Sequence, residues 1–555
     1  MEISWVVISY VLCITIQIFF CAYALLYTRR MRQSCSSEAA FLDTAEGFAT
    51  ARGSQGRWRI AWSFFAGSMG AWAITSPPNY AVQSGWVGMV SYAVSCGIPT
   101  ICVVTLGGEI QARWPQANSL ADFVSFRFGK RAKGCVMALT MFNMVIGLLA
   151  ELTTIGALFK DFVGAEAFPI VLTVAVLSTT YTLYGGLVVS IVTDQLQALF
   201  SIVLIVAISI WLLATFHTAL PPDFGGGQME KQLGSGNPAG LSSLFVMPLS
   251  LTASTLFSEA VWQRVWAAEG KASLRFGAAV GASATVVMVF LFGLAGFIAA
   301  WGGLVDIEKD DPNLYLFQVF KTTQKKGAQA RVDSWIEVMV LVVAAAMNEG
   351  AIDSAQNGLI SVANSCLPLG SSPFIPRLFV IIVTVPVVFL ALQGYQVLSI
   401  FLITNMACTC VFPAFVFGAW DTPLGRRVVT EAEFLSSIVF SMTTVTLYGI
   451  ARAWKDDLLV WDNVTYGMWY AWAGNEYLWD FFAVAAGSGV CGIMLSSTAN
   501  SVARLLSPCT RSCGSVCCRK GSVSGDDDQA KLLNSITDES SVYLTPAAEE
   551  SSTRS

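Results

Sequence analysis

The chain has 555 residues, of which 55% are hydrophobic and only 12% are charged, and its formal net charge is −5 with a single histidine. A water-soluble protein carries roughly twice that charged fraction, and long uncharged runs recur here from one end of the sequence to the other. The composition therefore excludes a soluble globular protein and predicts an all-α polytopic membrane protein.

Apolar runs of about 18 residues or more, the length that a spanning helix needs, recur about thirteen times. They cover residues 4–27, 59–76, 84–107, 134–159, 167–184, 188–215, 241–262, 274–302, 335–365, 374–393, 396–419, 430–451 and 477–497. The first run has no basic residue before it, whereas Arg29, Arg30 and Arg32 follow it. This pattern is typical of a spanning helix with an outer N-terminus and not of a cleaved signal peptide.

The charges of the loops agree with this orientation. The loops on the predicted inner side contain Arg57, Arg59, Arg127, Lys130, Arg131, Lys133, Lys271, Arg275, Arg426 and Arg427. Cytoplasmic loops are enriched in lysine and arginine, so we expect an integral protein of the plasma membrane with a cytoplasmic C-terminus. Loop 303–334 is the exception, because it places basic residues on the outer side, where longer folded loops escape the rule.

Two candidate modification sites lie near the end of the chain. Asn463 begins an Asn-Val-Thr sequon on a predicted outer loop and is a candidate for glycosylation. Past the last span, Cys517 and Cys518 lie among basic residues and are candidates for palmitoylation. A metal site is the weaker interpretation of these cysteines, because paired ligand spacing is missing. The serine-rich, acidic tail beyond Gly521 is typical of a disordered segment.

Polar side chains interrupt the long apolar run 335–366. They are Asn348, Glu349, Asp353, Gln356, Asn357 and Asn364. At 100° per residue, all of them except Asn348 fall within about one third of the helix circumference. A charge at bilayer depth costs several kcal/mol, so we expect this stripe to face other protein or a water-filled cavity. The stripe predicts a protein that moves something polar across the membrane.

The second span contains a run of small residues at which a helix could unwind. Residues 63–72 read Ser-Phe-Phe-Ala-Gly-Ser-Met-Gly-Ala-Trp, and Pro77 and Pro78 follow. Transporters of the inverted-repeat type use such turns, because unwound backbone frees carbonyl oxygens that can coordinate a cation. Close helix packing is the competing explanation and the commoner use of small residues in membranes.

Two further runs resemble the sodium/solute symporter family. Residues 184–197 contain a Gly-Gly-Leu element followed by Thr-Asp and Gln. Residues 258–268 contain Gln-Arg followed by Ala-Ala, in the order in which the family carries these elements. The likeness covers about residues 40–450 and is nearest to the urea/polyamine and proline branches.

The resemblance implies an architecture and a mechanism. Ten core helices would form two inverted five-helix repeats in residues 59–420, after an extra transmembrane helix in 1–30 and a cytoplasmic loop in 31–58. Two C-terminal transmembrane helices in 428–497 and a cytoplasmic tail in 498–555 would follow. The implied mechanism is cation-driven uptake by alternating access, with sodium or a proton as the coupling ion and no other cofactor.

The resemblance also implies a cation site. Its ligands would be the backbone carbonyls of Ala66 and Met69, together with Asp194, Ala345, Asn348 and Glu349. The family usually has two hydroxyls where this chain has Asn348 and Glu349. An ionised Glu349 would strengthen cation binding, whereas a neutral one could carry a proton. The chain would then be sodium-driven, proton-driven or uncoupled, and the competing interpretation is that Glu349 only hydrogen-bonds a neighbouring helix.

The same comparison suggests an inner gate and a solute site. Asp194 and Arg264 each lie near the inner end of a span, where an unpaired charge is expensive, so we predict an ion pair that closes the inner side. The alternative is that Arg264 extends alone to the inner surface. The predicted solute lining is Ser68, Trp72, Ser254, Thr255 and Glu259, and Glu151 could also reach the cavity.

The predicted function is secondary active transport that couples inward movement of a cation to the uptake of a small polar solute. An uncoupled facilitator or a transceptor on the same fold is the second hypothesis. A channel is less consistent with the sequence, because no re-entrant filter element is visible. No nucleophile elbow, phosphate loop or metal-ligand spacing indicates an enzyme. The expected partners are the solute, the cation and the bilayer, without nucleic acid.

Overall fold

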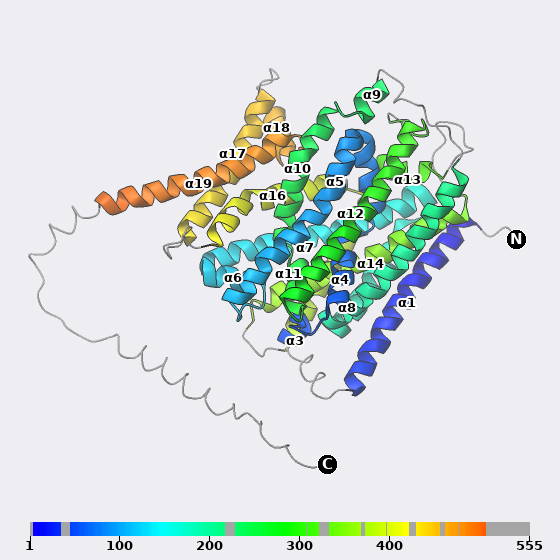
Figure 1. Ribbon diagram of the computed structural model, residues 1–555, viewed down its shortest axis with the longest axis horizontal. Helices are drawn as coiled ribbons and strands as arrows, with labels where there is room; N and C mark the ends of the chain where they lie inside the picture. The colour runs from blue at the N-terminus through cyan, green and yellow to red at the C-terminus, as the bar shows by residue number, and fades with distance from the viewer. Residues whose placement is uncertain are drawn as a thin grey trace, which may run out of the picture. The chain divides into compact units, whose positions relative to one another are not determined.

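A computed structural model of the chain describes residues 4–34, 45–216, 228–307, 309–320, 332–367, 372–395, 397–420, 429–454, 461–475 and 477–506. Within these residues the regular secondary structure is helical, and the one extended pairing is a parallel bridge between Gln55 and Ala268. The chain divides into two compact units, Met1–Ser496 and Ser497–Ser555. Figure 1 shows the helices of the first unit lying side by side, which confirms the predicted all-α membrane fold.

The long helices are α1 (Trp5–Ser34), α5 (Trp72–Arg113), α7 (Lys130–Ala157), α8 (Ala167–Thr215), α10 (Pro238–Leu256), α12 (Lys271–Trp301), α14 (Trp335–Asn364), α15 (Phe374–Ala391), α16 (Val397–Gly418), α17 (Glu431–Trp454) and α19 (Trp479–Leu506). The shorter helical elements are α3 (Ala45–Thr50), α4 (Arg57–Ser68), α6 (Leu120–Arg127), the π-helix η1 (Leu158–Val163), α9 (Gln228–Leu233), α11 (Glu259–Ala267), the 3₁₀-helix η2 (Pro312–Leu314), α13 (Tyr315–Gln318) and α18 (Trp461–Ala473). The short helix α3 lies inside the predicted cytoplasmic loop 31–58.

Eleven helices of the described chain are long and apolar enough to cross a membrane. Two of them reach into two predicted spans each: α5 contains the end of span 59–76 and the whole of 84–107, and α8 contains spans 167–184 and 188–215. The 42 residues of α5 would extend about 63 Å, twice the thickness of a bilayer core, but the helix bends at Gly85, where φ is 66°. The 49 residues of α8 bend at Gly186, where φ is 61°. With these bends the helices are compatible with the thirteen predicted spans, while the inverted repeat stays a prediction.

Glycine is required at both bends for two reasons. A positive φ is strained for any residue with a Cβ atom. A Cβ atom at Gly85 would also lie 2.8 Å from the carbonyl oxygens of Gln232 and Leu233, and one at Gly186 would lie 2.6 Å from the carbonyl oxygen of Phe48. The bends are therefore places where another segment of the chain touches the backbone.

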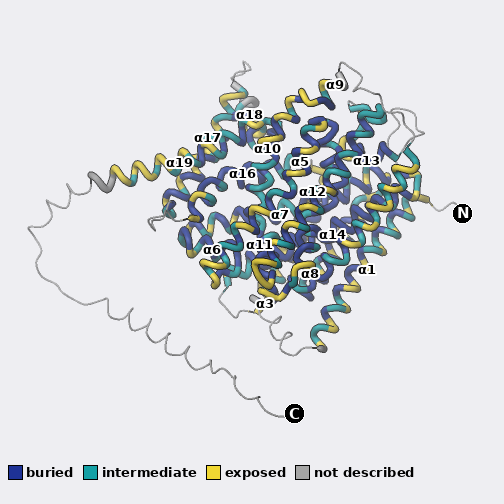
Figure 2. Tube along the Cα trace, in the orientation of Figure 1, coloured by how far each residue is buried: buried dark blue, intermediate teal, exposed yellow. Residues whose placement is uncertain are grey.

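Helix α14 is the most deeply buried of the eleven long helices. It packs against α8, α7 and the N-terminal helix α1, and the centre of the first unit is buried throughout in Figure 2. On another side of the unit, α12 packs along α5 and α4. A Cβ atom at Gly281 of α12 would lie 2.8 Å from the Cβ atom of Phe64, so small residues allow the backbones to approach closely.

Candidate functional site

The first core helix is broken between α4 and α5. Helix α4 ends at Ser68, Met69 is extended with φ −110° and ψ 126°, and α5 begins at Trp72. The carboxylate of Glu151, from α7, accepts a hydrogen bond from the backbone N–H of Ala71 at 2.8 Å. A Cβ atom at Gly70 would collide with this carboxylate, so glycine is needed there for the approach of Glu151. The break that the small residues predicted is present, and the residues within it also serve close packing.

A second break separates α10 from α11. The side chain of Asn143, on α7, donates to the carbonyl oxygens of Ser254 at 2.8 Å and Phe257 at 3.1 Å. These carbonyls lie at the end of α10, where the helix leaves its last carbonyls without partners. The first residue of α11, Glu259, accepts hydrogen bonds from the backbone N–H of Leu120 at 3.2 Å and from the Ser361 hydroxyl at 3.0 Å. The Asn143 amide thus supplies donors for two carbonyl oxygens at the break. Glu259 is fixed by hydrogen bonds from Leu120, which begins α6, and from Ser361 of α14.

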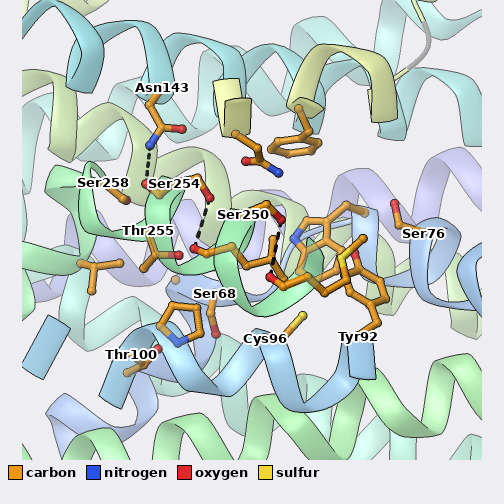
Figure 3. Close-up of a pocket in the computed structure, with 18 of the residues that line it drawn as sticks. Ser68, Ser76, Tyr92, Cys96, Thr100, Asn143, Ser250, Ser254, Thr255 and Ser258 are labelled. Carbon is orange, nitrogen blue, oxygen red and sulfur yellow. Dashed lines mark hydrogen bonds between the residues drawn. The ribbon is translucent and has the colours of Figure 1, made fainter. Parts of the chain in front are cut away.

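A cavity of about 280 Å³ lies between the two breaks. In Figure 3, Ser258 and Thr100 lie toward one end of the group of lining residues and Tyr92 and Ser76 toward the other, with Ser254 and Ser250 of α10 between them. The lining of this cavity includes Ser68, Trp72, Ser76, Asn79, Tyr80, Tyr92, Cys96, Thr100, Asn143, Ser250, Ser254, Thr255, Ser258, Arg264, Asn313, Phe401 and Asn405. The predicted lining residues Ser68, Trp72, Ser254 and Thr255 all border the cavity. Glu259 does not, because it points toward α6 and α14.

Several lining residues were not predicted from the sequence. Ser250 and Ser254 are four residues apart on α10, which places them on one helix face, and Ser258 follows at the same spacing just past the break, so this repeat could have identified them. Tyr92, Thr100 and Asn405 come from other helices and have no such signal.

A second cavity, of about 470 Å³, adjoins the first. Both are lined by Thr75, Asn79 and Asn313, so they are neighbours across these three residues. The second cavity also borders Asp311, in the loop after α12 that the sequence places outside the membrane. With the predicted orientation, this cavity would be an outer vestibule.

Arg264 forms the floor of the central cavity and is only 2% exposed. Its Nη2 atom donates to Asp194 Oδ2 at 2.9 Å and to the Ser354 hydroxyl at 2.7 Å. Its Nε atom donates to the hydroxyl of Ser63 at 2.7 Å, and that hydroxyl donates to Asp194 at 2.5 Å. The predicted ion pair therefore exists in the structure and joins α4, α8, α11 and α14, and its role as a gate is a proposal.

A small cavity of about 10 Å³, enough for a single water or ion, lies at the first break. It is lined by Phe65, Ala66, Met69, Gln197, Ala198, Ser201, Ala346, Met347 and Gly350. Ala66 and Met69 are the two residues whose carbonyls were predicted as cation ligands. The hydroxyl of Ser201 has no hydrogen-bond partner among the described residues. A Cβ atom at Gly350 would lie 2.8 Å from Gln197 Oε1, so this glycine leaves room beside the break.

The other predicted cation ligands lie around this small cavity without lining it. The Ala345 carbonyl accepts a hydrogen bond from Gln17 of α1 at 2.8 Å. The Asn348 amide donates to the Glu151 carboxylate at 2.8 Å. Asp194 is paired with Arg264, and both carboxylate oxygens of Glu349 lack a hydrogen-bond partner in the part of the chain that the structure describes.

Of the two surroundings expected for the polar stripe, other protein or a water-filled cavity, the structure shows contact with protein. Asp353 accepts a hydrogen bond from Thr182 at 2.5 Å, and Gln356 donates to Thr179 at 2.7 Å. Both threonines belong to α8, and neither acid of the stripe lines the central cavity or the vestibule. Hydroxyl groups of α8 thus act as the hydrogen-bond partners of these stripe residues.

The two candidate modification sites lie at the margin of the described residues. Asn463 falls near the start of α18, and the structure describes nothing of its side chain. Cys517 and Cys518 lie outside the described residues. Both modifications stay predictions.

Comparison with known proteins supports the resemblance. Residues 48–233 match the model of the sodium:solute symporter family. The chain is also 25% identical to the spermidine transporter of Candida albicans over 423 residues, which are 75% of this chain and 78% of that protein. The resemblance to the sodium:solute symporter family is confirmed. Over a shorter segment, 31% of this chain and 23% of the relative, it is 23% identical to the urea active transporter of Saccharomyces cerevisiae.

A solved structure agrees on the fold. A Na⁺-coupled sialic acid symporter in a substrate-bound, outward-open state superposes with a TM-score of 0.61, covering 88% of this chain and 98% of that chain. The identity is 14%, so this comparison bears on the fold alone. Family and relatives place the chain among secondary transporters and not among enzymes.

Proposed function

We propose that this protein couples the inward movement of sodium to the uptake of a small polar solute by alternating access. The observation that carries the proposal is the arrangement at the first break. A cavity of the size of one ion touches Ala66 and Met69, and a cavity large enough for a solute touches Ser68, between them in sequence. A single unwound segment therefore contacts both candidate sites, which allows binding at one to affect the other.

Sodium is the favoured ion because the small cavity offers oxygen atoms. Sodium is a hard cation that binds carbonyl and hydroxyl oxygens, and unwound backbone at a helix break supplies carbonyls. The Ser201 hydroxyl and the Gln197 amide, both on α8, lie opposite the break. They would take the place of the hydroxyl pair that the family carries on the eighth core helix.

The arrangement of the two larger cavities supports alternating access. The vestibule and the central cavity meet at Thr75, Asn79 and Asn313, on the predicted outer side. On the inner side, the buried pair of Arg264 and Asp194 lies beneath the cavity. We propose that this pair opens when the protein turns inward.

An uncoupled facilitator is the second candidate, and one observation favours it. Asn348 and Glu349, which stand where the family has its hydroxyl pair, do not line the small cavity. If oxygen atoms from α8 do not replace that pair, the fold would carry solute without a coupling ion.

The test is tracer accumulation in proteoliposomes that contain the purified full chain, with sodium and proton gradients imposed separately. A sodium gradient should drive accumulation above equilibrium, whereas a proton gradient alone should not. If the tracer only reaches equal concentrations inside and outside under both gradients, the protein is an uncoupled facilitator. Accumulation driven only by protons would contradict sodium coupling.

A glycine substitution tests the small cavity itself. Gly350→Ala places a methyl group 2.8 Å from Gln197 Oε1 and fills a space of about 10 Å³. The sodium concentration for half-maximal uptake should rise about tenfold or more, the equivalent of about 1.4 kcal/mol, while the solute KM changes less. Gly147→Ala on α7 is the matched control, because its Cβ atom meets nothing within 4 Å. An unchanged sodium dependence in Gly350→Ala would remove this cavity as the cation site.

A further inference from the structure

The central cavity offers a solute no unbalanced charge. Among the described residues that line it, Arg264 is the only ionised side chain, and none is an acid. The charge of Arg264 is balanced by Asp194 at 2.9 Å, and both side chains are buried. The rest of the lining consists of hydroxyls, amides, aromatic rings and aliphatic groups.

The helix ends at the two breaks are compensated as well. Helix N-termini carry partial positive charge, and half-helices in such transporters direct these ends at anionic groups of the substrate. Here the N-terminus of α5 already binds the carboxylate of Glu151, through the N–H of Ala71. The nine-residue α11 begins with Glu259, whose carboxylate is buried beside that end. At the first break the N–H of Ala71 is therefore already taken and is not available to a carboxylate of a solute.

We propose that the cavity takes a solute with no ionised group, one that presents hydroxyl, carbonyl or amide groups, and that it rejects polyamines, carboxylates and zwitterions. The inference rests on the proposed transport function and narrows its solute class. The physical reason is that a charge moved from water into a poorly solvated space needs a partner of opposite charge. The cavity has no free partner for either sign among its described residues.

The hydrogen-bonding groups of the cavity fit such a solute. The Oδ1 atom of Asn79 is buried without a hydrogen-bond partner among the described residues, at the border of cavity and vestibule. Ser250 and Ser254 on α10, and Ser258 at the start of α11, add three hydroxyls to the lining, as Figure 3 shows. These groups both donate and accept, so they suit hydroxyl, carbonyl and amide groups equally.

The aromatic residues do not replace a missing carboxylate. The rings of Trp72 and Tyr92 have centroids 6.2 Å apart, and those of Tyr80 and Tyr92 lie 4.9 Å apart, so the rings pack against one another. A cation over an aromatic face gains modestly, and a polyamine would need several such faces or acids. The rings are better suited to the apolar face of an uncharged solute.

The test uses radiolabelled probes of four charge classes in proteoliposomes of the full chain under a sodium gradient. The uncharged probes are urea, acetamide and myo-inositol, the cations are spermidine and choline, the anion is lactate and the zwitterion is proline. At least one uncharged probe should accumulate, and each charged probe should enter at least about tenfold more slowly. If spermidine, choline, lactate or proline accumulates as fast as or faster than the uncharged probes, the inference on the solute class is wrong, while the transport function stands. No accumulation of any probe would overturn both.

A substitution that adds a charge to the lining tests the inference independently. Asn405→Asp adds a carboxylate to the lining with little change in shape, and Asn405→Ser is the uncharged control. The aspartate variant should gain uptake of choline or spermidine by about tenfold or more relative to the serine variant. Equal uptake of cations by both variants would show that lining charge does not select the solute, which contradicts the proposal.

Discussion

The ion pair of Arg264 and Asp194 allows the sharpest prediction. Arg264 donates to Ser63, Asp194, Ser354 and the Ala260 carbonyl, and so joins four helices beneath the cavity. Asp194→Asn removes the only carboxylate paired with a guanidinium that is 2% exposed. Removal of one partner from a buried pair costs about 3–5 kcal/mol, because the other charge stays buried.

This cost should fall on the state that contains the pair, the one in which the inner side is closed. A loss of about 3 kcal/mol shifts an equilibrium by roughly 150-fold. If the pair is a gate, Asp194→Asn should shift the protein toward an inward-open state by a factor of that order. Uptake should fall at the same time, because the outward-facing state becomes rare.

The assay is thiol accessibility from the inner side. Ile191 is fully buried on α8, one turn before Asp194 toward the predicted inner end, so a cysteine there reports opening. The background lacks the cysteines that are exposed among the described residues, Cys102, Cys366 and Cys491, and also those of the predicted cytoplasmic loop and tail, Cys35, Cys509, Cys513, Cys517 and Cys518. In it, Ile191→Cys should react slowly with an impermeant reagent, and Asp194→Asn should accelerate the reaction up to about a hundredfold.

The double variants decide between a gate and a merely structural pair. Asp194→Asn with Arg264→Gln removes both charges and should label more slowly than the single variant, because no unpaired charge remains. The charge-swapped double variant should recover part of the uptake that each single charge reversal loses. The gate would be refuted if the swapped protein transports no better than either single variant and if labelling is the same in all of them.

Three further predictions concern the buried acids and a bend. Glu349→Gln keeps the shape of a side chain whose oxygens have no described partner, so uptake measured against sodium concentration should change if this acid takes part in coupling; an unchanged curve would refute any such role. Glu151→Ala removes the acceptor for the Ala71 N–H and should cost about 1–2 kcal/mol of local stability, seen as faster hydrogen exchange at residues 70–73, whereas Glu151→Gln should keep most of the protection. Gly186→Ala combines a φ of 61° with a Cβ atom 2.6 Å from a backbone oxygen and should lower the yield of folded protein in size-exclusion chromatography, while Gly147→Ala should not; equal yields would show that the bend tolerates a side chain.

The contrast between α10 and α14 shows what a pattern of polar residues can and cannot predict about the surroundings of a helix face. On α10, the prediction that Ser254 and Thr255 line a cavity agrees with their position. On α14, acids and amides also share one face, but Asp353 and Gln356 on that face contact α8 and do not line the cavity. A polar stripe requires partners of any kind, so periodicity alone does not distinguish water from threonine hydroxyls.

The ligand positions carried over to α14 illustrate the same limit. Neighbouring residues are 100° apart on a helix, so a shift of one position exchanges the residues that face a site. The resemblance placed Ala345, Asn348 and Glu349 at the cation, whereas Ala346, Met347 and Gly350 border the small cavity. A helix that is buried on nearly all sides has no exposed face to establish its rotation.

The sequence by itself indicated the class of protein, the apolar spans, a place where the second span could unwind and the residues able to pair at the inner side. These follow from local properties: apolar length, the absence of Cβ atoms at Gly67 and Gly70, and the cost of an unpaired charge in a membrane. Only the tertiary structure decided that Glu151 caps the first break and that Asp194 neutralises Arg264. It also decided that the described residues lining the central cavity present no unpaired charge. Those facts depend on side chains from helices far apart in the sequence, whose approach is set by packing and not by any local pattern.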